Sequence, residues 1–296
     1  MTHPPLTLIA GPTASGKSRL ALETARTTGA AILNADSQQL YADLSILSAR
    51  PSAEDVAAAE HRLYGVADAA DAWSVGRWAR AVLNEIGALE AEGRPAILVG
   101  GTGLYFLSLT RGLADIPEVR VEVRDQSQAA FDNEGEAVFR RRLGAVDPQT
   151  EAAIAPGDRQ RLVRAFSVHA QTGRPLSAFK ADTRPLIAPD RWTGLVIEPE
   201  RERLYAACDA RVDLMIEGGA LDEVRALMAR RLDPGLPAMK AVGVRELAAH
   251  LAGEMMRDDA VAAMKQATRN YAKRQLTWFR NQTPDWPRHP GQVMSP

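Results

Sequence analysis

The 296-residue chain has a single cysteine, Cys208, a formal net charge of only −1, and no apolar run close to the roughly 20 residues that would cross a membrane. One cysteine excludes an intrachain disulfide and a cysteine-rich zinc site. Because the N-terminus shows no signal-peptide pattern before its first strand-like segment, we expect a cytoplasmic protein without membrane contact.

Familiar catalytic signatures are also missing. The sequence contains no HExxH metalloprotease motif, no GxSxG nucleophile elbow, no GxGxxG dinucleotide fingerprint and no Asn-Lys-x-Asp motif for reading guanine. The charge is unevenly distributed, because residues 1–150 hold 14 basic and 19 acidic side chains, whereas the remainder holds 22 and 18. The mild basic excess of the second half permits an anionic partner there.

The most informative segment is Gly-Pro-Thr-Ala-Ser-Gly-Lys-Ser, which follows the apolar run Leu6–Ala10 and precedes a helical segment. It matches G-x-x-x-x-G-K-S, the loop (P-loop) whose backbone N–H groups surround a phosphate at a helix N-terminus. The lysine adds a positive charge, and the serine hydroxyl can hold Mg²⁺. The predicted phosphate-binding residues are Gly11, Pro12, Thr13, Ala14, Ser15, Gly16, Lys17 and Ser18, with Ser18 as the metal ligand.

The first part of the chain alternates apolar strands with helices, which is typical of a parallel sheet covered on both faces. We predict strands at 6–10, 30–35, 63–66, 95–99 and 192–197, and helices at 18–27, 73–92, 200–232 (split at Gly218-Gly219) and 259–282, with an irregular tail from Pro284. Residues 118–182 are charged, helical and poor in strands, with breaks at Pro148, Pro156-Gly157 and Gly173-Arg174-Pro175. We therefore predict an α/β fold, a P-loop NTPase-like parallel sheet flanked by helices (1–115 and 193–296), with an inserted all-helical domain at 116–192.

Two further candidate residues come directly after predicted strands. Asp36 follows the second strand, where its carboxylate could accept a proton or bind magnesium, although an aspartate there can also cap a helix. Thr102 stands among three glycines after the strand 95–99, and a tight turn is the alternative interpretation. Because parallel strands end at one edge of a sheet, both side chains should lie near the phosphate loop.

Three basic segments could contact phosphates. Arg161 and Arg164 share a face of the predicted helix that follows Asp158, and Lys240–Arg245 forms a second segment. In the last helix Lys265, Arg269 and Lys273 recur every four residues and could follow a nucleic-acid backbone. Each pattern is also common on a solvated helix face.

Together these segments resemble tRNA dimethylallyltransferases, the isopentenyltransferases that modify the adenosine beside the anticodon. The resemblance runs from Gly11 to about Arg280 and implies a magnesium-dependent variant of the P-loop fold with a helical insert. The segments that carry it are GPTASGKS (11–18), ADSQQLY (35–41), VGGTGLYF (99–106), DRQRLVRA (158–165), KAVGVRE (240–246) and YAKRQLTWFR (271–280).

The resemblance implies that dimethylallyl diphosphate donates its five-carbon group to N6 of the adenosine on the 3′ side of the anticodon, with release of diphosphate. Lys17 would then hold the diphosphate, Asp36 would act as the base and Thr102 would bind or orient the amine. The tRNA-contacting residues implied are Asp36, Ser37, Gln38, Gln39, Thr102, Arg120, Gln160, Arg161, Leu162, Val163, Arg164, Lys240, Ala241, Val242, Gly243, Val244 and Arg245, with Arg124 as the substitute for Arg120.

Three other functions use the same residues. A P-loop kinase of a nucleoside or small metabolite would use ATP as donor, Asp36 as base and the arginines Arg159, Arg161 and Arg164 as a lid. A related transferase would act on free AMP or ADP, and a non-catalytic nucleotide switch would bind RNA without needing Asp36. The large insert and the basic last helix favour a macromolecular acceptor. We expect a monomer that uses Mg²⁺ as its cofactor.

Overall fold

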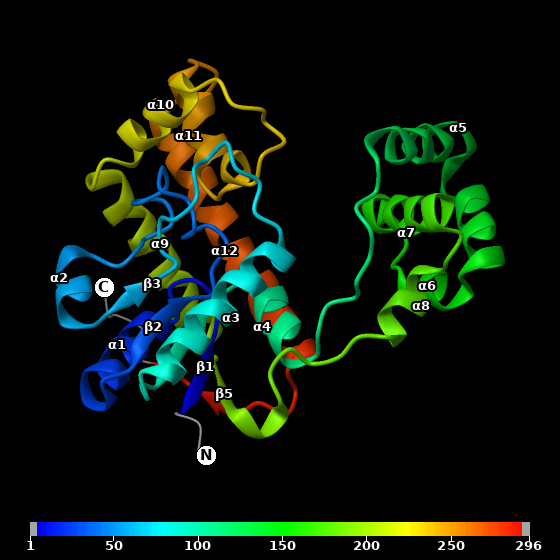
Figure 1. Cartoon of the computed structure of the whole chain (residues 1–296). Helices are drawn as coiled ribbons and strands as arrows, with labels where there is room; N and C mark the ends of the chain where they lie inside the picture. The colour runs from blue at the N-terminus through cyan, green and yellow to red at the C-terminus, as the bar shows by residue number, and fades with distance from the viewer. Residues whose placement is uncertain (1–4, 292–296) are drawn as a thin grey trace. The chain divides into compact units, whose positions relative to one another are not determined.

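The computed structural model describes residues 5–291 and divides the chain into two compact units (Figure 1). The larger unit consists of Met1–Thr110 and Ile187–Pro296, and the smaller unit is the insert Arg111–Leu186. The insert begins five residues and ends six residues before the range 116–192 that the sequence indicates. Each unit is described by itself below.

The larger unit is built on a six-stranded parallel sheet with the order β3-β2-β4-β1-β5-β6. This confirms the predicted fold class, and four of the five predicted strands form within one or two residues of their predicted ends. The third differs, because β3 comes two residues before the predicted range 63–66. The strands are β1 (Leu6–Ala10), β2 (Ala31–Asn34), β3 (His61–Arg62), β4 (Ala96–Gly100), β5 (Trp192–Ile197) and β6 (Arg288–His289).

The tail from Pro284 was expected to be irregular, and this expectation is wrong for two residues. β6 adds a parallel edge strand to β5, with Arg288 opposite Val196 and His289 opposite Ile197. Both β3 and β6 are two residues long. Strands this short carry no alternating pattern, so their positions follow from the neighbouring strand rather than from local sequence.

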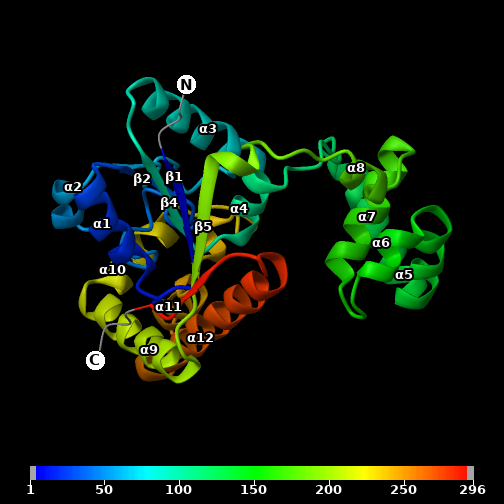
Figure 2. The ribbon, with the colours of Figure 1, turned by 90° about the horizontal axis from the view of Figure 1, so that it is seen from below.

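Helices cover both faces of the sheet, and α1 (Lys17–Thr28) and α4 (Gly103–Thr110) lie on opposite sides of the strands (Figure 2). Ala21 and Ala25 of α1 pack on Ile9, Ile32 and Ile97 of the strands. On the other face, α3 (Val75–Ala91) contacts β2 and α4 contacts β1. This double cover explains why the strands read as continuous apolar runs.

The remaining helices of the larger unit form a group after β5. They are α9 (Arg201–Glu217), α10 (Ala220–Ala229), the short η2 (Ala238–Lys240), α11 (Val244–Leu251) and α12 (Arg257–Gln282). A further short helix, α2 (Ala53–Ala58), follows β2, and η1 (Pro189–Arg191) precedes β5. The predicted break between α9 and α10 at Gly218-Gly219 is confirmed, since both glycines lie between the two helices.

The insert is entirely helical over its described elements, α5 (Val121–Val146), α6 (Pro148–Ala153), α7 (Arg159–Thr172) and α8 (Leu176–Ala181). Its core is formed by apolar side chains of α5, α7 and α8 and of Ile154, including Phe139, Leu162 and Leu176. The predicted breaks at Pro148, at Pro156-Gly157 and at residues 173–175 are confirmed. Among the described residues, no helix is long and apolar enough to cross a membrane.

Candidate active site

The P-loop connects β1 to α1 and presents its backbone toward the helix N-terminus. Gly16 has φ +85°, a conformation that a side chain would strain, and the first turn of α1 has no side-chain cap. The first N–H groups of the helix are therefore available to an anion. Ser15 Oγ is also buried with no hydrogen-bond partner among the described residues. These features fit the predicted phosphate site, whose role stays a prediction.

Lys17 is held inside this loop. Its side chain is 8% exposed, and its Nζ donates a hydrogen bond to the Pro12 carbonyl at 3.1 Å. Burial lowers the pKa of Lys17 from 10.5 to about 8, because the charged ammonium loses water. The carboxylate of Asp36 opposes this effect and the guanidinium of Arg211 adds to it. An incoming anion would restore the stabilisation that the ammonium lacks.

Asp36 is fixed by a neighbour that sequence reasoning missed. The side chain of Asn34 accepts a hydrogen bond from the Asp36 N–H at 2.7 Å and donates to the Leu63 carbonyl at 2.9 Å. Asp36 Oδ1 accepts from the Gln38 N–H at 3.0 Å, and the chain continues as turns. The helix-cap alternative for Asp36 is therefore wrong, because the carboxylate closes a turn instead.

Thr102 lies beside this turn. Its hydroxyl accepts a hydrogen bond from the Ser37 N–H at 2.9 Å and donates to Ser37 Oγ at 3.2 Å. Its own N–H donates to the Ala35 carbonyl at 3.2 Å. A Cβ on Gly100 would lie 2.0 Å from that carbonyl, so only glycine permits the approach. The loops after β2 and β4 are thus bonded to each other, as their shared sheet edge predicts.

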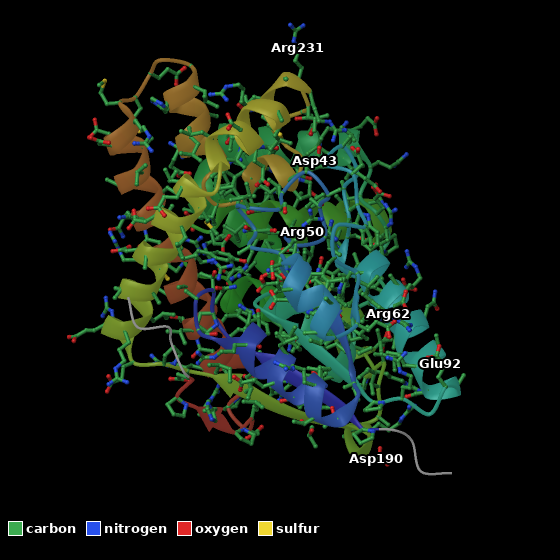
Figure 3. The ribbon with its side chains drawn as sticks, turned by 90° about the vertical axis from the view of Figure 1, so that its left-hand side faces the viewer. Asp43, Arg50, Arg62, Glu92, Asp190 and Arg231 are labelled. Carbon is green, nitrogen blue, oxygen red and sulfur yellow. The ribbon has the colours of Figure 1, made fainter. Side chains whose placement is uncertain are left out.

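A pocket forms between the P-loop and the loop that follows Asp36. Its polar side chains include Lys17, Ser18, Asp36 and Arg211. Its apolar side includes Leu47, Met215, Val242 and Met264, with Tyr271 at the same pocket. Gln38, Gln39, Leu47 and Ser48 also line the pocket, and they belong to the segment in which Asp43 and Arg50 are labelled in Figure 3. A charged end beside an apolar end suits a molecule with an anionic head and a hydrocarbon tail.

Arg211 is a second residue that sequence reasoning missed. Its Nη2 donates to the Ser48 carbonyl at 3.4 Å, and its Nε is buried with no hydrogen-bond partner in the described structure. Burial lowers the pKa of Arg211. A signal existed, because Leu204, Cys208, Arg211 and Met215 fall at helical spacing on one side of α9, where a charge among apolar residues needs a partner.

The segment Lys240–Arg245 divides into two kinds of residue. Lys240 and Arg245 are exposed, and Val242 lines the pocket. Ala241 and Val244 are buried, so their side chains contribute to packing and are not available to an RNA. Gly243 has φ +96°, and a Cβ there would lie 2.9 Å from Leu47.

The basic stripe on the last helix was predicted to be available to a nucleic-acid backbone, and this prediction is wrong for two of its three residues. Lys265 pairs with Asp213, and Arg269 pairs with Asp209, so two of its three cations are neutralised by α9. Arg280 of the same helix pairs with Glu198. Only the third member of the stripe, Lys273, remains exposed without a partner in the described part of the chain.

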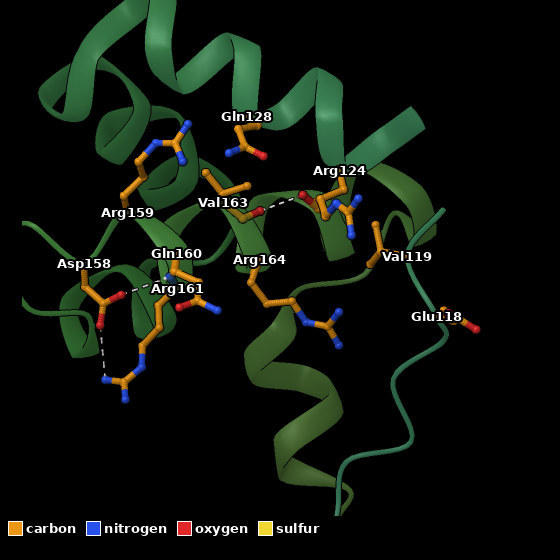
Figure 4. Close-up of a pocket in the computed structure, with 11 residues that line it drawn as sticks. Glu118, Val119, Arg124, Gln128, Asp158, Arg159, Gln160, Arg161, Val163 and Arg164 are labelled. Carbon is orange, nitrogen blue, oxygen red and sulfur yellow. Dashed lines mark hydrogen bonds and ion pairs between the residues drawn. The ribbon is translucent and has the colours of Figure 1, made fainter. Parts of the chain in front are cut away.

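The insert carries a pocket of about 740 Å³ on α5 and α7 (Figure 4). Arg124, Gln160, Arg161 and Arg164 line it, and Arg164 is exposed. Arg161 makes an exposed ion pair with Asp158 at 3.4 Å. Such exposed pairs are weak, so both arginines are free to bind phosphate instead.

Three of the residues predicted in the insert take other positions. Leu162 and Val163 are buried in its core, although Val163 also reaches the pocket wall, so we restrict the predicted interface to the polar residues of α7. Arg120 precedes α5 and its N–H donates to Gln171 at 2.7 Å. The structure places Arg124 rather than Arg120 at the pocket.

Comparison with known proteins identifies the family. The family model for IPP transferase matches residues 39–282. The chain belongs to the IPP transferase family. It is 58% identical over 283 residues to a tRNA dimethylallyltransferase of Caulobacter sp. strain K31, covering 96% of this chain and 92% of that protein. It is 57% identical to the protein of the same name in Phenylobacterium zucineum strain HLK1, covering 98% and 95%.

Solved structures of this family share the fold. A tRNA isopentenylpyrophosphate transferase from Bacillus halodurans matches with a TM-score of 0.67 at 29% identity, over 96% of this chain and 89% of that one. A eukaryotic dimethylallyltransferase acting on tRNA matches with a TM-score of 0.79 at 25% identity, over 93% and 70%. The phosphate-binding, catalytic and tRNA-binding roles of individual residues of this IPP transferase-family chain stay predictions.

Proposed function

We propose that the chain transfers a dimethylallyl group from dimethylallyl diphosphate to N6 of the adenosine on the 3′ side of the tRNA anticodon, and releases diphosphate. The observation that carries the proposal is the junction of three loops at one sheet edge, where Ser37 bonds to Thr102 and the Gly11 N–H donates to the Gly100 carbonyl at 3.3 Å. It brings a phosphate site, the Asp36 carboxylate and the Thr102 hydroxyl together. Relatives named tRNA dimethylallyltransferase support the choice of donor and acceptor.

The anionic end of the donor fits the P-loop. Lys17, Arg211 and Ser18 at the uncapped N-terminus of α1 line the same pocket, and Ser15 Oγ of the P-loop is buried without a partner among the described residues. These groups stabilise the charge that develops on diphosphate as the bond to carbon breaks. The buried, partly unpaired cations gain most when the leaving group is most negative, which favours the transition state over the ground state.

Magnesium fits the same end of the pocket. Ser18 offers a hydroxyl oxygen at the start of α1, which is an oxygen ligand of the kind that Mg²⁺ prefers. Among the described residues there is no cluster of three or more acidic, histidine or cysteine side chains to hold a metal alone. The ion would therefore enter with the diphosphate oxygens, and it would supply charge neutralisation of the leaving group.

Asp36 is placed to accept the proton that the N6 amine loses. An adenine amine is a weak nucleophile, because its lone pair is delocalised into the ring, and it attacks the electron-deficient allylic carbon. The carboxylate is 9% exposed, and its turn is held by Asn34 and by the Gln38 N–H. Thr102, bonded to Ser37, would orient the amine, and the base must leave its stack to arrive there.

The tRNA would be bound by basic and polar groups of both units. In the larger unit these are residues 36–39, Lys240 and Arg245. In the insert they are Gln160, Arg161, Arg164 and Arg124. Phosphate contacts of this kind supply affinity that weakens with salt. The buried side chains of these segments support the backbone instead.

A transfer assay tests the proposal. Purified protein, Mg²⁺ and unmodified tRNA with A at the modified position are incubated with labelled dimethylallyl diphosphate or labelled ATP, and the nucleosides are analysed by mass. We expect isopentenyladenosine from the prenyl donor only. Label passing from ATP to a small acceptor, or prenyl transfer to free AMP and not to tRNA, would refute the proposal in favour of a kinase or a free-nucleotide transferase.

A further inference from the structure

The segment 271–280 carries part of the family resemblance, yet the proposed function uses none of its polar side chains. One of them, the uncharged side chain of Gln275, is buried. Gln275 lies in the middle of α12 and is 6% exposed, and both ends of its amide are hydrogen-bonded. A buried polar side chain in a helix interior is conspicuous, because burial without full pairing is destabilising.

The amide of Gln275 joins two separate loops. Its Oε1 accepts a hydrogen bond from the Thr13 N–H at 2.9 Å, and its Nε2 donates to the Gly101 carbonyl at 2.9 Å. Thr13 is in the P-loop, and Gly101 immediately precedes Thr102. A Cβ on Gly101 would lie 2.2 Å from Nε2, so a glycine at 101 is what admits the amide. The two bonds bridge the phosphate side and the acceptor side of the site.

The helix that carries Gln275 is itself firmly packed. Ala272 and Leu276 on either side pack with Leu204 and Cys208 of α9, and Ala14 of the P-loop packs on the same cluster. One turn later, the ring of Phe279 meets Phe106 edge-on, with centroids 6.3 Å apart. The amide is therefore attached to a rigid support rather than to a flexible surface helix.

We propose that Gln275 is a positioning residue that sets the separation between the P-loop and the Thr102 loop, and so the distance between leaving group and amine. The inference rests on the proposed function for the identity of those two groups. The residue touches neither substrate and acts through the peptides of Thr13 and Gly101. Displacement of reacting groups by about 1 Å lowers rates by about 100-fold, so such a bridge affects turnover more than binding.

A primary amide meets both demands of this position at any pH. One partner is an N–H and needs an acceptor, whereas the other is a C=O and needs a donor. A carboxylate can accept but not donate, and an ammonium can donate but not accept. A protonated carboxylic acid does both, which gives the position a chemical signature that can be read by pH.

The test compares three variants with the wild-type full-length protein. Gln275→Met keeps the length of the side chain and removes both bonds, and Gln275→Glu keeps the acceptor. Gln266→Met is the matched control, since Gln266 lies on the same helix and is exposed. We expect kcat at saturating substrates to fall about 10- to 100-fold in Gln275→Met. The dissociation constants for tRNA and donor should change less than about threefold, and the control should match the wild type.

The pH dependence of kcat in Gln275→Glu distinguishes a positioning role from a general loss of structure. We expect its kcat, divided by the wild-type kcat at each pH, to rise as pH falls, because protonation of the introduced carboxyl restores the donor to Gly101. The same ratio for Gln275→Met should stay flat. Wild-type kcat in Gln275→Met, a flat ratio for Gln275→Glu, or a loss of binding as large as the loss of kcat would each overturn the inference.

A measurement without catalysis keeps this test separate from the proposed function. In ligand-free protein, the Thr13 amide should exchange its hydrogen faster in Gln275→Met than in the wild type, and it should stay protected in Gln275→Glu. Unchanged exchange in Gln275→Met would show that the bridge does not hold the P-loop, and would overturn the inference. Absence of prenyl transfer by the wild type would instead refute the proposed function.

Discussion

Lys17→Met is expected to make the ligand-free protein more stable while abolishing its use of the donor. The ammonium of Lys17 is buried, and this lowers its pKa from 10.5 to about 8. A lowered pKa of that size corresponds to about 3 kcal/mol by which the charged group opposes folding at pH 7. Methionine has nearly the same length and no charge.

The gain is reduced by one lost hydrogen bond. Lys17 donates to the Pro12 carbonyl, and leaving that acceptor unpaired would cost about 1–2 kcal/mol. The net increase in the free energy of unfolding should therefore be about 1–2 kcal/mol at pH 7. The same substitution removes the cation that stabilises the leaving group, so donor turnover should fall by at least about 100-fold.

The advantage of Lys17→Met should shrink as pH rises above 7. The folded wild type releases the Lys17 proton near pH 8, whereas the unfolded chain keeps it until about pH 10.4. Between those values the unfolded state binds more protons, so wild-type stability rises with pH relative to the variant. Between pH 7 and pH 9.5 the free energy of unfolding of the wild type should rise by about 2 kcal/mol relative to that of the variant.

Urea unfolding, followed by tryptophan fluorescence, measures the free energy of unfolding of the larger unit, which contains Lys17. All five tryptophans lie outside the insert, at positions 73, 78, 192, 278 and 286. Lys273→Met is the control, because it removes an exposed lysine in place of a buried one, and it should not reproduce the gain in stability at pH 7. A Lys17→Met variant less stable than the wild type at pH 7, or a pH-independent difference, would refute the reasoning.

Three further outcomes are expected. Asp36→Asn should bind the donor normally but turn over about 10²- to 10⁴-fold more slowly, measured by single-turnover prenyl transfer; a near wild-type rate would remove Asp36 as base. Arg161→Ala combined with Arg164→Ala should reduce the slope of log affinity for tRNA against log salt by about 2, and an unchanged slope would exclude both from the interface. Chelation by EDTA should stop transfer, and added Mg²⁺ should restore it; transfer that persists in EDTA would argue against a metal.

Local sequence patterns were enough for the P-loop and for four of the six strands. The apolar runs of β1, β2, β4 and β5 and the glycine-lysine motif are contiguous in the chain, so each is visible without knowing the fold. Asp36 and Thr102 followed from the rule that parallel strands end at one edge. Their mutual contact through Ser37 confirms that geometric step.

What the sequence could not predict depends on partners that are far apart along the chain. Gln275 meets Thr13 across 262 positions and Gly101 across 174, and nothing near Gln275 indicates either. The cations of α12 lost their predicted role for the same reason, since Lys265 and Arg269 meet acids 52 and 60 positions earlier on α9. Charge along one helix therefore says little until the neighbouring helix is known.

The charges gathered in the pocket constrain its occupant. Lys17 and Arg211 contribute two positive charges and Asp36 one negative charge, so the described pocket carries an excess of one positive charge in poorly solvated surroundings. Burial lowers the pKa of both cations, which means that each charged form is unfavourable until an anion binds.

A magnesium complex of a diphosphate ester carries one net negative charge and neutralises the pocket, whereas a neutral prenyl alcohol would leave the repulsion between the two cations in place. After transfer, the released diphosphate carries one more negative charge than the bound donor. Lys17 and Arg211 therefore hold the product more tightly than the donor and oppose its release. The same groups that promote departure of diphosphate from carbon should therefore slow its departure from the protein.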